Sequence, residues 1–230
     1  MKPQDLAPRI ALAAAVVGAI AYVFTWNGAA PVPVVTALKG TGVGFLAIYA
    51  ALLARELDGW LIAIVMLLGM LGDVLLDSMG LETGALAFMA GHVVAIILYL
   101  RNLRARPGPA TLAAMALFVV AATAFAAWLP GDPAAVVPVG LYTAGLALMA
   151  ACAWISRFPR ALTGLGALLF LVSDLLIFAR LGPLAGQAWP AYGVWGFYFA
   201  GQLLIVLGVT GALAAREAAN PTTVSDVSAP

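Results

Sequence analysis

The sequence predicts an all-α fold, a polytopic membrane bundle of eight transmembrane helices with both termini cytoplasmic. Hydrophobic residues make up 64% of the 230 residues and charged residues only 9%, whereas about 25% of the residues in a soluble domain are charged. Eight apolar stretches follow one another with short connections, and each approaches the roughly 20 residues that a helix needs to cross a bilayer. Lysine and arginine gather in alternate connections, as expected of a multi-pass protein.

The first stretch is rich in alanine and follows Lys2 and Arg9. We interpret it as a membrane-anchored helix over residues 9–26. A basic start before an apolar core also fits a signal peptide, with the Asn-Gly-Ala-Ala-Pro segment at residues 27–31 as the cleavage region. The sequence leaves both interpretations open.

The other seven stretches complete a single domain over residues 1–215. Glycines beside Lys39 in the second stretch indicate close helix packing. Pro130-Gly-Asp-Pro133 predicts a tight turn between the fifth and sixth helices. The polar segment 216–230 is expected to be a disordered cytoplasmic tail. The remaining helices are expected at residues 32–54, 59–78, 83–100, 110–129, 134–156, 160–179 and 191–215.

The connections on one side of the predicted bundle are basic. On the other side Arg180 is the only basic residue, and Glu82 and Asp132 lie there. The positive-inside rule therefore directs the basic side to the cytoplasm, and we expect the protein in the inner (plasma) membrane. The basic side carries Lys2, Arg9, Arg55, Arg101, Arg104, Arg106, Arg157, Arg160 and Arg216.

Composition excludes several classes of function. The net charge of +1 argues against a nucleic-acid partner. One cysteine, Cys152, cannot form an internal disulfide or a cysteine-rich metal site. One histidine, His92, cannot form a three-histidine zinc centre. No metal and no cofactor is predicted.

Strongly polar side chains inside the predicted spans fall at one depth. At about 1.5 Å per residue, most lie roughly 7 to 16 Å below the outer ends of their helices, and Asp77 lies near the interface. An acid at membrane depth costs about 2.5 to 3.5 kcal/mol on insertion scales and usually faces a bundle interior or a water-filled cavity. We call this set the polar layer: Lys39, Asp73, Asp77, His92, Asp174, Tyr198 and Gln202.

The polar layer has the composition of a catalytic site. Asp73 and Asp77 are four residues apart and point to one side of a helix, and Lys39 can neutralise one aspartate. A pair of carboxyls with one ionised and one protonated suits acid/base catalysis. The same groups also hold helix bundles together, so a structural role stays open for any one of them. Ser173 beside Asp174 suggests a nucleophile, but the only histidine would have to reach it from another helix.

The order and spacing of these residues resemble the YhhN family of membrane lysoplasmalogenases. The resemblance extends from Lys39 to Gln202, through essentially all the helices. Gly40 follows the lysine, where the family often has proline. The matching pieces are Lys39, Gly72-Asp73, Leu75-Leu76-Asp77, Phe88, Gly91-His92, Tyr99, Ser173-Asp174, Tyr198 and Gln202.

The resemblance implies hydrolysis of the sn-1 vinyl ether bond of a lysoplasmalogen, to a fatty aldehyde and a glycerophospho-base. We hypothesise that Asp73 and Asp174 are the acid/base pair and that His92 and Tyr198 orient water or move protons. The expected partners are a lysophospholipid substrate and membrane lipid; the oligomeric state stays open. The side chains expected to bind substrate are Lys39, Asp77, Tyr99, Ser173 and Gln202.

Three other classes of function compete. A transporter or receptor for a small lipid or ion would use the polar layer as a proton relay, although no strong inverted repeat is visible. A structural membrane protein would tolerate neutral replacements throughout the layer. A carboxylate-rich metal hydrolase would have His92 as its only imidazole ligand.

Overall fold

The structure, a computed structural model, describes residues 6–28 and 30–219. Within this part of the chain eight helices are long and apolar enough to cross a membrane, and no strand forms. The predicted all-α fold of eight spanning helices is therefore confirmed. The helices are α1 (Leu6–Phe24), α2 (Val32–Leu53), α3 (Leu57–Met79), α4 (Leu81–Arg101), α5 (Pro109–Trp128), α6 (Val136–Ile155), α7 (Leu165–Ala179) and α8 (Trp189–Ala219).

Short helical turns extend three of the spans, and a 3₁₀ turn, η2 (Thr25–Asn27), directly follows α1. A 3₁₀ turn, η3 (Pro133–Ala135), precedes α6, and a π-helical turn, η4 (Arg160–Gly164), precedes α7. The predicted turn before η3 is present, because Gly131 has a φ of +69° and the Asp132 carboxylate accepts a hydrogen bond from the Ala134 amide at 2.9 Å. Helix α8 continues to Ala219, four residues beyond Ala215. The rest of the predicted tail lies outside the described residues.

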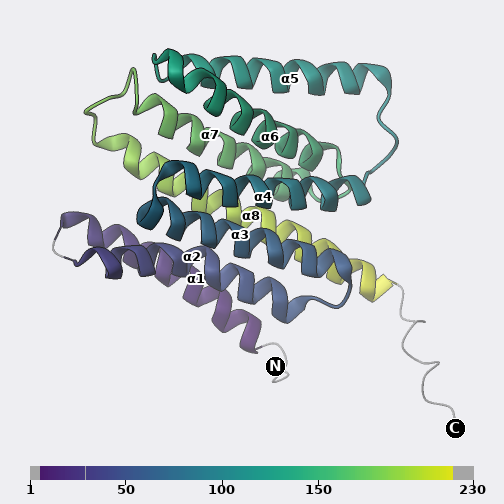
Figure 1. Cartoon of the computed structure of the whole chain (residues 1–230). Coiled ribbons are helices and arrows are strands. Elements are labelled where there is room, and N and C mark those ends of the chain that lie inside the picture. The colour runs from purple at the N-terminus through teal and green to yellow at the C-terminus, as the bar shows by residue number, and fades with distance from the viewer. Residues whose placement is uncertain (1–5, 29, 220–230) are drawn as a thin grey trace, which may run out of the picture.

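The helices form a bundle with α1 at one edge and α5 at the other (Figure 1). Along the front, α2 packs on α1, α3 packs on α2, and α4 packs on α3. Helix α4 also contacts α6, and α5 packs on the other side of α6. Helix α8 passes behind the middle of the bundle and contacts α2, α3 and α7. The first residue of α1 and the last of α8 lie at the same end of the bundle.

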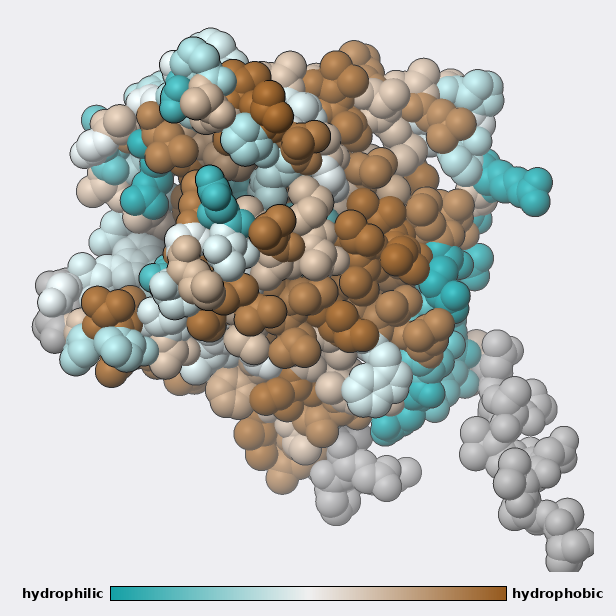
Figure 2. All heavy atoms as spheres, viewed as in Figure 1, coloured by the Kyte–Doolittle hydropathy of each residue, from teal (hydrophilic) through white to brown (hydrophobic). Residues whose placement is uncertain are grey.

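The surface has the pattern of a membrane protein. Figure 2 shows a broad hydrophobic belt with hydrophilic residues gathered on either side of it, toward the two ends of the helices. Large apolar side chains such as Leu86, Leu117 and Val137 are about two-thirds or more exposed. Exposed leucine and valine on this scale would aggregate in water but are solvated by lipid tails. The chain is a multi-pass membrane protein.

Glycines on α3 allow the helices around the polar layer to approach closely. A Cβ atom on Gly72 would lie 2.8 Å from the Phe88 ring of α4, and a Cβ atom on Gly69 would lie 3.0 Å from Nε2 of Gln202 on α8. Small residues are used this way throughout membrane bundles. On α3 they bring α4 and α8 against the turn that carries Asp73.

The end of the bundle opposite the polar layer carries a cluster of charged and amide groups that joins three helices. Buried Asp58, in the first turn of α3, accepts hydrogen bonds from Arg101 Nε at 3.0 Å and from Asn102 Nδ2 at 2.8 Å. Arg216 of α8 donates to Asn102 Oδ1 at 2.9 Å. The Asn102 carbonyl also accepts from the Arg157 amide at 2.7 Å, beyond the end of α6. We call Asp58, Arg101, Asn102 and Arg216 the Asp58 cluster.

Candidate functional site

Asp73 on α3 is paired with Tyr198 on α8. The Tyr198 hydroxyl donates to Asp73 Oδ2 at 2.7 Å, and both side chains are buried. Asp73 forms no ion pair within the described residues. A buried polar group needs a partner, and here the partner is a neutral hydroxyl from a helix 125 positions away in sequence.

Asp174 on α7 has an equivalent partner on α6. The Tyr142 hydroxyl donates to Asp174 Oδ2 at 2.6 Å, and the Tyr142 hydroxyl oxygen lies 3.4 Å from Nε2 of His92 on α4. Three helices therefore contribute to one polar chain. His92 and Asp174 are both at least 95% buried.

Aromatic rings separate the two aspartate–tyrosine pairs. The Phe170 ring on α7 lies 5.2 Å from Tyr198 and 5.2 Å from His92, measured between centroids. Phe88 on α4 lies 6.0 Å from Phe170 and 5.9 Å from Tyr198. These ring contacts are all edge-on. Such rings can also stabilise a nearby cation through their faces.

The lysine of the polar layer is paired with Asp77 and not with Asp73 or Asp174. Lys39 Nζ lies 2.6 Å from Asp77 Oδ1, with the two side chains 11% and 22% exposed. Asp77 is one turn beyond Asp73, nearer the end of α3. The ion pair therefore lies at the rim of the polar layer, near the end of α3.

Gln202 leaves one polar atom without a partner. The side chain is 1% exposed, and its Oε1 accepts no hydrogen bond within the described residues. Both Gln202 Nε2 and the Tyr198 hydroxyl lie over Gly69, 3.0 and 3.5 Å from where a Cβ atom on that glycine would be. A buried acceptor without a donor is costly, and this one belongs to a side chain that lies with Tyr198 over the same glycine of α3.

Ser173 and Tyr99 are not brought into the same constellation. The Ser173 hydroxyl donates to the Val194 carbonyl at 2.9 Å and so links α7 to α8. Tyr99 shares the buried face of α4 with His92, but it lies seven residues on, about 10 Å along the helix. Its ring contacts Phe158, in the connection after α6. The proposed substrate-binding roles of Ser173 and Tyr99 remain untested predictions.

Tyr142 was not singled out by the sequence analysis. A tyrosine in an apolar span is usually read as packing, and α6 carries no charged residue to draw attention to it. Depth is the signal that would have found it. Tyr142 is six residues into α6, and Asp174 is five residues from the end of the antiparallel α7, so the two side chains lie at the same level.

The arrangement supports acid/base chemistry through its own side chains. Two buried carboxyls, two tyrosine hydroxyls and one imidazole can deliver, accept and relay protons. Among residues 6–28 and 30–219, no three histidine, cysteine, aspartate or glutamate side chains are grouped as ligands for a metal ion.

Comparisons with known proteins identify the family. No curated protein and no solved structure matches the chain. The profile of the YhhN family matches residues 34–209, which include the whole polar layer, all but the first two residues of α2, and the helices from α3 to α7. The extent of this match shows that the chain belongs to the YhhN family.

Proposed function

We propose that the protein is a membrane hydrolase that cleaves the sn-1 vinyl ether bond of lysoplasmalogens. The observation that carries the proposal is the pairing of two buried aspartates with tyrosines of other helices, on either side of Phe170. Membership of the YhhN family agrees with a role of this kind.

The reaction needs one proton donor and one water. Protonation of the β-carbon of the enol ether turns R–CH=CH–O–R′ into the oxocarbenium ion R–CH₂–CH=O⁺–R′. Water adds to the cationic carbon and loses a proton, which gives a hemiacetal. The hemiacetal breaks its bond to the glycerol oxygen, and the products are the aldehyde R–CH₂–CHO and the alcohol R′–OH. A general acid, an anionic partner for the cation and a positioned water suffice.

Asp174 is the proton donor in this proposal. Its hydrogen bond to Tyr142 and the contact of Tyr142 with His92 form a route that returns the proton after each turnover. Asp73 is the carboxylate that balances the oxocarbenium ion and takes the proton from water. Tyr198 holds the Asp73 carboxylate in position, and the faces of Phe88 and Phe170 add cation–π stabilisation.

The remaining residues of the layer bind the polar part of the lipid. The orphaned Oε1 of Gln202 accepts a hydrogen bond from the free sn-2 hydroxyl of the lysolipid, a group that a two-chain plasmalogen lacks. Lys39 meets the phosphate at the rim and exchanges its contact with Asp77 for one with the lipid. The substrate then lies with its vinyl ether one helical turn deeper than its phosphate, at the level of Asp73.

The Asp58 cluster favours a hydrolase over a transporter. Alternating access needs the helices to separate at both ends of the bundle in turn. At the end away from the polar layer, α3, α4 and α8 are joined through Asp58, Asn102 and Arg216. We place the arginine-rich end in the cytoplasm of an inner (plasma) membrane, on the positive-inside rule.

The test is hydrolysis by the detergent-purified full chain. Lysoplasmenylethanolamine and the matched ester lysolipid are offered side by side, with Asp73→Asn and Asp174→Asn as variants. Aldehyde released from the vinyl ether alone, and lost in both folded variants, supports the proposal. Fatty acid released from the ester would mean that the enzyme cleaves an ester bond and not the vinyl ether bond. Wild-type rates in both variants would remove the aspartates from the mechanism.

A further inference from the structure

A groove of about 570 Å³ runs along the lipid-facing side of α5 and α6. Small side chains, including Ala114 on α5 and Ala151 on α6, leave the space between the two helices unfilled, and Phe118 and Leu168 line it further along. Helix α5 lies at the edge of the bundle (Figure 1), and Ala126 is its only buried residue. The groove therefore opens to membrane lipid.

One end of the groove is basic and has a fixed geometry. Arg160 Nε donates to the Trp154 carbonyl at 3.0 Å, and its guanidinium carbon lies 5.7 Å from the centre of the Trp154 ring. Both residues line the groove. The two terminal nitrogens of Arg160 donate to no protein acceptor in the described part of the chain, and none of the lining residues is acidic. Arg157, three residues earlier, is also exposed.

We propose that this groove binds an anionic phospholipid, with one acyl chain along α5 and α6 and the phosphate paired with Arg160. The groove is apolar where the chain would lie and cationic where the headgroup would lie. A guanidinium offers two parallel donors to a phosphate. Tryptophan prefers the interface between headgroups and chains, which is the level at which Trp154 holds Arg160.

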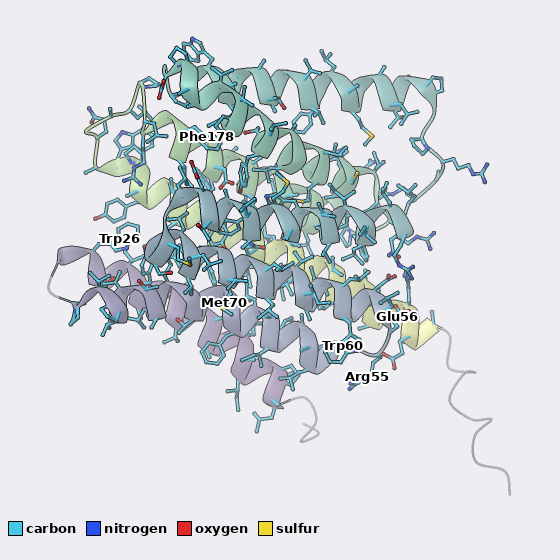
Figure 3. All side chains as sticks on the ribbon, in the orientation of Figure 1. Trp26, Arg55, Glu56, Trp60, Met70 and Phe178 are labelled. Atoms are coloured by element: carbon cyan, nitrogen blue, oxygen red, sulfur yellow. The ribbon has the colours of Figure 1, made fainter. Side chains whose placement is uncertain are left out.

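A second groove supplies an internal comparison. It has a similar volume, about 570 Å³, and lies between α2 and α3, where Met70 and Trp60 line it (Figure 3). Its lining contains no charged residue. A lipid chain in that groove has no protein charge to select its headgroup, so the preference for an anionic lipid belongs to the Arg160 groove alone.

Bound lipid would also complete the packing of α5. This helix rests mainly on α6 and touches α7 only slightly. A chain that fills the space between Phe118 and Leu168 contacts all three helices at once. Basic pockets between transmembrane helices are known sites for anionic headgroups, and here the pocket lies at the arginine-rich end.

The experiment is native mass spectrometry of the full chain in detergent, with dioleoylphosphatidylglycerol or dioleoylphosphatidylcholine added. The wild-type protein is expected to prefer phosphatidylglycerol. Arg160→Gln is expected to weaken that binding about fivefold and to remove the preference. The control Arg55→Gln removes a charge at the same end, between α2 and α3 and away from α5 (Figure 3), and is expected to change nothing.

A second pair of variants tests the chain-binding part of the groove without changing charge. Ala114→Leu, in the Arg160 groove, is expected to reduce phosphatidylglycerol binding, while Ala51→Leu, in the α2–α3 groove, is expected to leave it intact. Equal affinity for the two lipids in the wild type would overturn the proposal, as would unchanged binding in both Arg160→Gln and Ala114→Leu. Displacement of the lipid by inorganic phosphate alone would also overturn the proposal, because the acyl chain would then contribute nothing to binding.

Discussion

Tyr142 donates its hydroxyl hydrogen to Asp174 over 2.6 Å, and its oxygen lies 3.4 Å from His92 Nε2. A tyrosine hydroxyl has one hydrogen, so the contact with His92 requires a hydrogen on Nε2. The three side chains thus form a directed chain from His92 through Tyr142 to Asp174. Protons can return along this chain to the residue that we propose as the general acid.

The first prediction concerns this chain. Tyr142→Phe keeps the ring and removes the only link between His92 and Asp174. We expect kcat to fall about 100-fold with KM nearly unchanged, because in the proposed mechanism Tyr142 contacts Asp174 and His92 rather than the lipid. Steady-state aldehyde release measures both constants. Tyr192→Phe is the matched control, since Tyr192 is exposed and packs on Trp26. An equal loss in both variants would contradict the relay.

The second prediction separates binding from structure at the Lys39–Asp77 pair. If Lys39 binds the phosphate of the substrate, then Asp77 and the phosphate compete for the ammonium group of Lys39. Lys39→Gln is then expected to raise KM about tenfold, whereas Asp77→Asn is expected to leave KM unchanged or lower it. A purely structural ion pair would give the same increase in both variants. The measurement is KM for the lysolipid, with thermal unfolding as a check on folding.

The third prediction concerns the orphaned oxygen of Gln202. Gln202→Leu removes the acceptor proposed for the sn-2 hydroxyl, and kcat/KM is expected to fall about 5- to 150-fold. A 2-deoxy substrate analogue should show the same loss with the wild-type enzyme and little further loss with the variant. If the losses in kcat/KM from the variant and from the 2-deoxy analogue multiply, then Gln202 and the sn-2 hydroxyl do not interact.

The fourth prediction addresses a serine nucleophile. The Ser173 hydroxyl donates to the Val194 carbonyl and joins α7 to α8. Ser173→Ala is expected to keep the wild-type kcat and to lose about 1 kcal/mol of unfolding free energy. Complete loss of turnover in a folded variant would restore the hydrolase triad as the mechanism.

The fifth prediction concerns stability at the opposite end. Asp58→Ala leaves Asn102 and Arg101 without their shared acceptor. We expect a loss of about 1 to 3 kcal/mol, or several degrees of Tm for a chain of this size. Arg101 is 48% exposed, so its ion pair with Asp58 contributes only a small part of this stability. Turnover per folded molecule should persist, because the cluster lies far from Asp73. Thermal unfolding of Asp58→Ala beside Arg55→Gln checks this.

Hydropathy was enough to predict the spans. A segment in lipid must form its backbone hydrogen bonds internally, so each long apolar stretch becomes a helix. The helix ends lie where the composition changes from apolar to polar. The predicted third helix at residues 59–78 is observed as Leu57–Met79. Depth along each helix also follows from counting residues, so Asp73, His92, Asp174 and Tyr198 could be assigned to one layer.

Partners within the layer could not be predicted, because they depend on which helices are neighbours. From the sequence, Lys39 could form an ion pair with either Asp73 or Asp77 of α3. The packing of the helices determines that the partner is Asp77. Tyr142 was missed because an isolated tyrosine in an apolar span has no periodic signal. The Asp58 cluster was missed because Asp58, at the start of α3, contacts residues at the far ends of α4 and α8.

The polar layer lies toward only one end of the bundle, away from the Asp58 cluster. A hydrolase built this way draws its lipid from a single leaflet and releases a water-soluble base on that side. Under the proposed function, each turnover would release a headgroup from one face of the bilayer and none from the other. The resulting mismatch in headgroup area between the two leaflets would make the proposed reaction a source of membrane curvature stress.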